Sequence, residues 1–73
     1  MTHSEMMILL NMMAEHEELR SMQVGSLGII YDPLSDSGGA WEIYDGNNQG
    51  VLLDKYCDIH RCATVILAHV RNE

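Results

Sequence analysis

The sequence predicts an α+β domain in which a helix, a three-stranded antiparallel β-meander and a second helix packed on the sheet follow one another (αβββα). A capping signal precedes an apolar segment near the start of the chain. Three short segments rich in β-branched and aromatic residues follow, separated by turn-forming residues, and an amphipathic segment comes last. Three strands with an apolar face covered by helices form a stable unit. The 73 residues are too few for two cores, so we expect one domain, 1–73.

The first helix is expected to follow Thr2 and to extend to about Met22. Thr2 and Glu5 have the spacing of a capping box, in which each side chain binds the other residue's backbone N–H. Gly25 would then end the helix, as a glycine just past a helix C-terminus commonly does. Apolar side chains in 6–13 cover about 200° of the helix circumference, which is more than packing on one sheet face requires.

The strands are expected at three segments: 27–31, 40–45 and 51–56. The connections between them, 32–39 and 46–50, consist of turn-forming residues. In the middle strand, the alternation of side chains places Trp41 on the face opposite Tyr44.

The second helix is expected from Ile59 to about Arg71, with Asp58 as its N-cap. Its apolar residues share a single arc of about 140°, which is typical of a helix that buries one face against a sheet. The two helices therefore differ in how much of their surface is apolar.

The net charge of −7, from 11 acidic and 4 basic residues, bears on the class of partner. Nucleic acids and anionic membranes are poor partners for such a chain, because phosphate groups require a basic surface. A protein complex with a basic surface suits it better. Alternatively, the charge only keeps a small domain in solution. No basic leader segment is evident and the run 6–13 is too short to cross a bilayer, so we expect a cytoplasmic location.

The segment 57–62 is the one local cluster of metal-ligand residue types. It offers Cys57, His60 and Cys62, but their spacing matches no zinc knuckle, and a helix would turn His60 away from Cys62. Catalysis by Cys57 would require a base and an oxyanion site in a cleft, which a domain of this size rarely encloses. We therefore expect no metal, no cofactor and no enzymatic activity.

Acidic and aromatic side chains are the candidate partner-binding residues. Clustered carboxylates can occupy a Lys/Arg-lined channel, and aromatic residues often anchor interfaces. The candidates are Glu15, Glu17, Glu18, Asp32, Asp36 and Asp45 as electrostatic contacts and Tyr31, Trp41 and Tyr44 as anchors.

The methionine-rich part of the first helix is a candidate dimer interface through Met7, Ile8 and Met12. Methionine adapts to irregular surfaces and recurs at binding faces, and a homodimer is the simplest way to cover a second apolar face. The alternative is that these residues only fill the core of a chain without Phe.

Residues 41–63 resemble a pattern found in short phage and bacterial proteins. A strand with a Trp and an aliphatic residue leads through an Asp-Gly turn to a second strand that ends in an aromatic residue before a capped helix. The matching residues are Trp41, Ile43, Asp45, Gly46, Val51, Tyr56, Asp58 and Ala63. The turn 47–50 is longer than in the common form. The resemblance implies a hairpin packed on a helix and no particular activity.

In its type the chain resembles phage-encoded inhibitors of host defence, anti-CRISPR proteins included, which are small, acidic and without catalytic residues. That likeness implies a stoichiometric inhibitor that binds a nucleic-acid-handling complex of the host. The alternative function is a structural or assembly protein that forms a homodimer through its methionine-rich helix.

Overall fold

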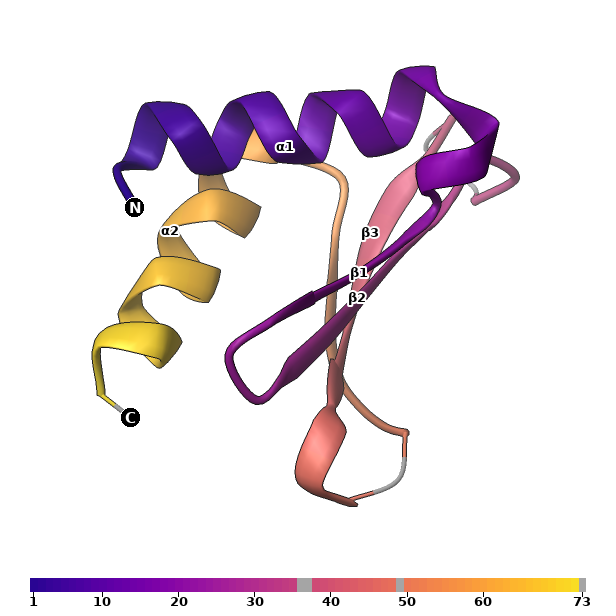
Figure 1. The fold of residues 1–73 in the computed structure, drawn as a ribbon. Helices are drawn as coiled ribbons and strands as arrows, with labels where there is room; N and C mark the ends of the chain where they lie inside the picture. Colours follow the sequence, from indigo (N-terminus) through magenta and orange to yellow (C-terminus); the bar gives the residue numbers. More distant parts are fainter. Residues whose placement is uncertain (36–37, 49, 73) are drawn as a thin grey trace.

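The computed structural model describes residues 1–35, 38–48 and 50–72. It confirms an α+β fold, with two helices and a four-stranded antiparallel sheet in the order β1-β2-β3-β4 (Figure 1). The elements are α1 (His3–Glu15), the short 3₁₀ turn η1 (Glu17–Leu19), β1 (Ser21–Val24), β2 (Leu27–Asp32), β3 (Ala40–Asp45), the 3₁₀ turn η2 (Gly46–Asn48), β4 (Val51–Tyr56) and α2 (Ile59–Arg71). The three strands expected from the sequence are present, and β1 is an additional strand.

The expected extension of the first helix to Met22 is wrong. The helix ends at Glu15, and His16 has extended backbone angles. Acidic residues at a helix C-terminus are unfavourable for the helix dipole, and the last turn of α1 has no basic residue to offset them. Met22 instead lies in β1, paired with Ile29 of β2. Gly25 belongs to the turn that joins these strands, with a positive φ of 57°.

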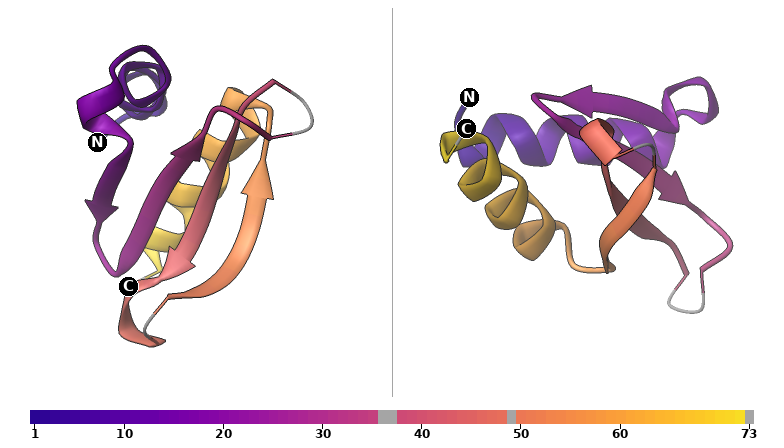
Figure 2. Two further views of the ribbon diagram at one scale, coloured as in Figure 1. Left: turned by 90° about the vertical axis from the view of Figure 1, so that its right-hand side faces the viewer. Right: turned by 90° about the horizontal axis from the view of Figure 1, so that it is seen from below.

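Both helices lie on the same face of the sheet and leave the other face uncovered (Figures 1 and 2). Side chains from α1, α2 and the inner face of the sheet form one core. Its members are Met6, Leu10, Met13, Leu27, Ile29, Trp41, Ile43, Cys62, Ala63, Ile66 and Leu67. The indole N–H of Trp41 donates to the carbonyl of Leu10 at 3.0 Å, so the most polar atom of the core is paired.

The caps expected for both helices are confirmed. The Thr2 hydroxyl accepts from the Glu5 N–H at 3.1 Å, and the Glu5 carboxylate accepts from the Thr2 N–H at 2.9 Å. At α2 the Asp58 carboxylate accepts from the N–H of His60 at 2.9 Å. These contacts satisfy N–H groups that have no partner within a helix.

The connection between β2 and β3 needs glycine at its end. Gly39 has a φ of 132°, and a Cβ at this position would collide with the hydroxyl of Tyr31. Asp36, one of the candidate partner contacts, lies outside the described residues.

Candidate functional site

One end of the molecule gathers part of the predicted acidic set. Glu15, Glu17 and Glu18 lie at the end of α1 and in η1, and all three are exposed. The backbone N–H of Tyr31 donates to the carbonyl of Arg20 at 2.9 Å, so the chain after η1 runs beside the end of β2, where Asp32 lies. We call Glu15, Glu17, Glu18 and Asp32 the acidic end.

The acidic residues predicted as electrostatic contacts do not form one continuous group. Asp45 lies at the opposite end of β3, and the five residue steps from Ala40 to Asp45 span roughly 17 Å. The Asp45 carboxylate accepts from the N–H of Asn47 at 2.9 Å, which gives it a local role in the turn. The structure therefore separates Asp45 from the acidic end.

The three predicted aromatic anchors lie in different environments. Trp41 is buried in the core, so it is not accessible to a partner, and its assignment as an anchor is a misreading of a core residue. Tyr31 is partly buried beside it, with ring centroids 5.1 Å apart. The guanidinium of Arg20 lies over the ring of Tyr31, 5.2 Å from the ring centroid. Only Tyr44 lies on the uncovered face of the sheet.

The uncovered face carries Tyr44 among carboxylates. The Tyr44 hydroxyl donates to the Glu42 carboxylate at 3.0 Å. This hydrogen bond, followed by burial and by the charges of Glu42 and Asp32, raises the pKa of Tyr44 above its ordinary value. Tyr44 also lies opposite Gly28, which leaves room for its ring. The hydroxyl is thus held by its own sheet.

The outer side of α1 is apolar and exposed. Ile8 is 60% exposed and Met12 is 38% exposed, whereas Met7 is partly buried and packs against the core. Of the three residues predicted for a dimer interface, two therefore lie on the solvent side of α1. The apolar surface continues into η1, where Leu19 is 38% exposed.

A small cavity of about 170 Å³ opens where this apolar surface meets β1. It is lined almost entirely by apolar side chains: Leu9, Met12, Met13, Leu19, Ser21 and Met22. The sequence did not predict this cavity, because it forms only when the chain after Glu15 leaves the helix and β1 returns beside α1.

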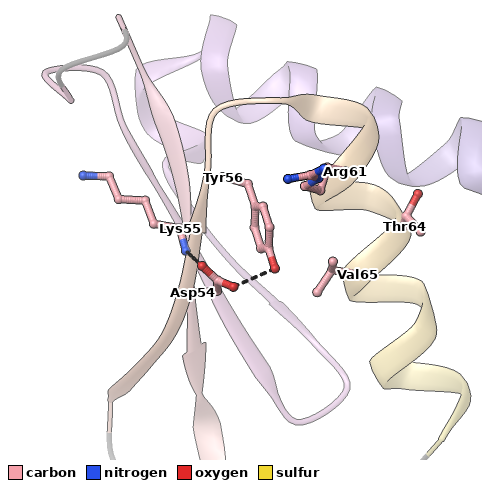
Figure 3. A pocket seen from close by; sticks show the side chains of 6 residues that line it. All are labelled: Asp54, Lys55, Tyr56, Arg61, Thr64 and Val65. Carbon is pink, nitrogen blue, oxygen red and sulfur yellow. Dashed lines mark hydrogen bonds between the residues drawn. The ribbon is translucent and has the colours of Figure 1, made fainter.

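A larger hollow of about 720 Å³ lies between β4 and α2 (Figure 3). It is lined by Asp54, Lys55, Tyr56, Arg61, Thr64 and Val65. The Asp54 carboxylate accepts from the Lys55 N–H and from the Tyr56 hydroxyl, each at 2.8 Å. These two bonds lower the pKa of Asp54, and the same carboxylate raises the pKa of Tyr56.

The direction of the Lys55 N–H can be derived from the sheet. Tyr31 donates its N–H to the carbonyl of Arg20, the residue before β1. The backbone groups of the preceding residue, Ile30, therefore point the other way, to its β3 partner Glu42. The backbone groups of Glu42 then point back to β2. Those of Lys55, the β4 partner of Glu42, consequently point away from the sheet.

The outer edge of β4 is therefore capped by its own side chain. The outward N–H of Lys55 donates to the Asp54 carboxylate, so it is not free to donate to the carbonyl of an added strand. Val51, Leu52 and Leu53 are about half exposed along the same strand. Capping by a carboxylate reduces the tendency of such an apolar edge to pair with another strand.

The cysteine and histidine residues of 57–62 do not converge. Cys57 is exposed and Cys62 is buried, and burial raises the pKa of the Cys62 thiol to about 12. A thiol with this pKa is a poor nucleophile and a poor metal ligand at neutral pH. Within residues 1–35, 38–48 and 50–72, no three His, Cys, Asp or Glu side chains are placed to hold a metal ion.

Taken together, fold and surfaces define a small α+β domain in which an exposed apolar surface on α1 continues to the acidic end. Comparison with protein-family models, with curated proteins and with solved structures found no match. In the part of the chain that the structure describes, no helix has the length and apolar character needed to span a bilayer.

Proposed function

We propose that this chain is a non-enzymatic, acidic protein-binding module. In this proposal it acts in the host cytoplasm as a stoichiometric inhibitor of a nucleic-acid-handling defence complex, in the manner of anti-CRISPR proteins. The observation that carries the proposal is the acidic end, where three exposed carboxylates follow one another in η1 and the preceding turn of α1.

The distribution of basic residues supports the same proposal. The first 19 residues contain no Lys or Arg. Of the four basic residues, Lys55, Arg61 and Arg71 lie in β4 and α2, and Arg20 covers the ring of Tyr31. Arg20 lies next to the acidic end, but four carboxylates against this one guanidinium leave an excess of negative charge that can complement a channel lined by Lys and Arg.

The test is capture of binding partners from a host lysate by tagged protein at low and high salt. One variant carries Glu15→Gln, Glu17→Gln and Glu18→Gln. A matched control carries Ala68→Lys, His69→Lys and Asn72→Lys on exposed positions near the end of α2. Each variant raises the formal net charge by three, so the two have the same net charge and change it at opposite places in the fold.

We expect wild-type protein to retain one nucleic-acid-binding complex at low salt and to release it at high salt. The glutamine variant should retain about tenfold less, a loss of about 1.4 kcal/mol in binding free energy. The lysine control should retain as much as the wild type. Equal retention by both variants would contradict a role for the acidic end.

A structural protein that dimerises through α1 is the second candidate. The exposure of Ile8 and Met12 favours it, because monomeric proteins rarely leave large apolar patches uncovered. Sedimentation equilibrium tests it: a dimer that Met12→Glu dissociates would support this function, and a monomer at high concentration would exclude it.

A further inference from the structure

We propose that the outer side of α1, with the cavity between α1, η1 and β1, binds a basic amphipathic helix of the partner. This inference rests on the proposed protein-binding function and adds the chemistry of the partner segment and the place where it binds. Its components are an apolar strip, acidic residues near both ends of the strip and a cavity sized for one side chain.

The apolar strip runs along α1 and into η1. We define it as Met1, Ile8, Leu9, Met12 and Leu19. Ile8 and Met12 are one helical turn apart and therefore share a face of α1. A shallow hollow of about 240 Å³ lies at its N-terminal end, and the 170 Å³ cavity lies at the other end. No part of the strip belongs to the buried core.

The charges near the strip favour a partner with positive charge. Glu5 lines the N-terminal hollow, and Glu18 directly precedes Leu19 of the cavity, with Glu15 and Glu17 earlier in the same segment. Arg20 follows Leu19, but its guanidinium lies over the ring of Tyr31. A helix with lysine or arginine beside its apolar face would place cations next to these carboxylates.

A second copy of this chain fits the strip less well. Two α1 helices packed in parallel would bring the three glutamates after Ala14 together. An antiparallel pair would bring Glu5 of one copy near the same glutamates of the other. Like charges placed together at an interface disfavour the complex, so the same strip that suggests a dimer is better suited to a basic partner.

The cavity is suited to an anchoring side chain. At about 170 Å³ it is smaller than the roughly 300 Å³ at which pockets for small molecules begin. Methionine side chains from both α1 and β1 line it, and methionine adapts to the shape of an inserted group. An apolar residue of a partner helix, flanked by cations, matches both the lining and the surrounding charge.

Binding of a partner strand at the β4 edge is the competing mode. It would have to displace the Asp54 carboxylate from the Lys55 N–H and from the Tyr56 hydroxyl. The strip on α1 requires no such displacement, because its exposed groups are side chains of a hydrogen-bonded helix. The strip on α1 and the β4 edge are both about half exposed. Only binding at the β4 edge would first require hydrogen bonds to be broken.

The experiment uses a synthetic peptide of leucine and lysine, about five helical turns long, with leucine at i, i+3, i+4 and i+7. An isomer of the same composition without this period controls for charge. Binding is measured by fluorescence anisotropy to the full chain and to a Met12→Asn, Leu19→Asn variant. The matched control variant is Leu52→Asn, on a residue that is 49% exposed in β4.

We expect the periodic peptide to bind about tenfold more tightly than its isomer. The Met12, Leu19 variant should lose that advantage, and the Leu52 variant should keep it. In methyl spectra of ¹³C-methionine protein, the signals of Met12 and Met22 should shift on binding while that of the buried Met6 stays in place.

Equal binding of the two peptides would overturn the inference, as would an equal loss in the Leu52 variant. A wild-type dimer that dissociates in the Met12, Leu19 variant would also overturn it, in favour of a second copy. The lysate capture separates this failure from failure of the proposed function. If the glutamine variant loses the captured complex while the Met12, Leu19 variant keeps it, the proposed function is supported and the proposal that the strip binds a helix is wrong.

Discussion

The two helices of this domain have the same length but differ in how many of their apolar side chains are buried. Each has 13 residues, each has a side-chain N-cap, and both cover the same face of the sheet. In α2 the apolar residues form one buried arc, and the outward positions are polar or small. In α1 the inner side is equally buried, but Ile8 and Met12 remain on the outside. Packing within the domain explains why the apolar residues of α2 lie where they do. In α1 it explains the apolar residues of the inner side but not Ile8 and Met12.

Charge separates the two helices in the same way. Arg61 and Arg71 belong to α2, whereas α1 and η1 contain only acidic residues and histidine among their titratable groups. An exposed apolar side bordered mainly by carboxylates is typical of an interface with a partner of the opposite charge. The stability of the fold therefore depends on the inner sides of both helices, and the outer side of α1 is the surface that we propose binds a partner.

The largest expected effect distinguishes the inner from the outer side of α1. Leu10→Ala removes a fully buried side chain and should lower the free energy of unfolding by about 3 kcal/mol. Ile8→Ala, two positions earlier, should change it by less than about 0.5 kcal/mol, because Ile8 is largely exposed. Urea denaturation measures both. Similar losses in the two variants would mean that the outer side also supports the fold.

The next effect concerns the link between α1 and the sheet. Trp41→Phe keeps an aromatic ring in the core and removes the donor to the Leu10 carbonyl, which is left without that bond. We expect a loss of about 1–3 kcal/mol in unfolding free energy by the same denaturation measurement. An unchanged midpoint would show that the hydrogen bond does not contribute to stability.

The two N-caps offer a smaller, matched comparison. Thr2→Ala and Asp58→Ala should each destabilise the domain by about 1 kcal/mol. Thermal unfolding followed by circular dichroism measures both. Thr2→Ala should cost at least as much, because the capping box at α1 joins two residues. A much smaller cost for Thr2→Ala would indicate that the start of α1 contributes little to the folded state.

The smallest effect is a pH dependence at the same capping box. The bonds from Thr2 hold the pKa of Glu5 below its ordinary value of 4.5, so the ionised form stabilises the fold. This contribution is present above pH 4.5 and is lost as the pH falls through the lowered pKa of the folded state. Wild-type protein should therefore lose stability faster than Glu5→Gln on acidification below pH 4.5. Parallel pH curves for the two proteins would show that Glu5 is not held in this way.

Much of the fold could be predicted because local signals agreed with each other. The bounds of β3, β4 and α2 follow from alternation, turn residues and one clean apolar arc. The segment 21–24 could not be assigned as easily, since four residues carry little periodicity and Gly25 also fits a helix end. The turn at Gly25 that pairs Met22 with Ile29 is stabilised by a contact with the next strand, which a local pattern does not contain.

The candidate site was less predictable than the fold. Alternation showed that Trp41 and Tyr44 point in opposite directions, but only packing decides which face the helices cover. The acidic residues after Ala14 are exposed, as the hypothesis that they act as electrostatic contacts requires. Asp45 was grouped with them, although strand direction carries it to the other end of the sheet. The cavity beside Met12 depends on three segments meeting, so no single stretch of sequence indicated it.

The most direct test of partner binding at the outer side of α1 is capture of the partner by two apolar-to-polar double variants. One carries Met12→Asn and Leu19→Asn on the strip, and the other carries Leu34→Asn and Leu52→Asn on exposed residues elsewhere. We predict that the first retains about tenfold less partner at low salt and that the second retains as much as the wild type. Equal retention by both variants, with both folded, would contradict the assignment of partner binding to α1.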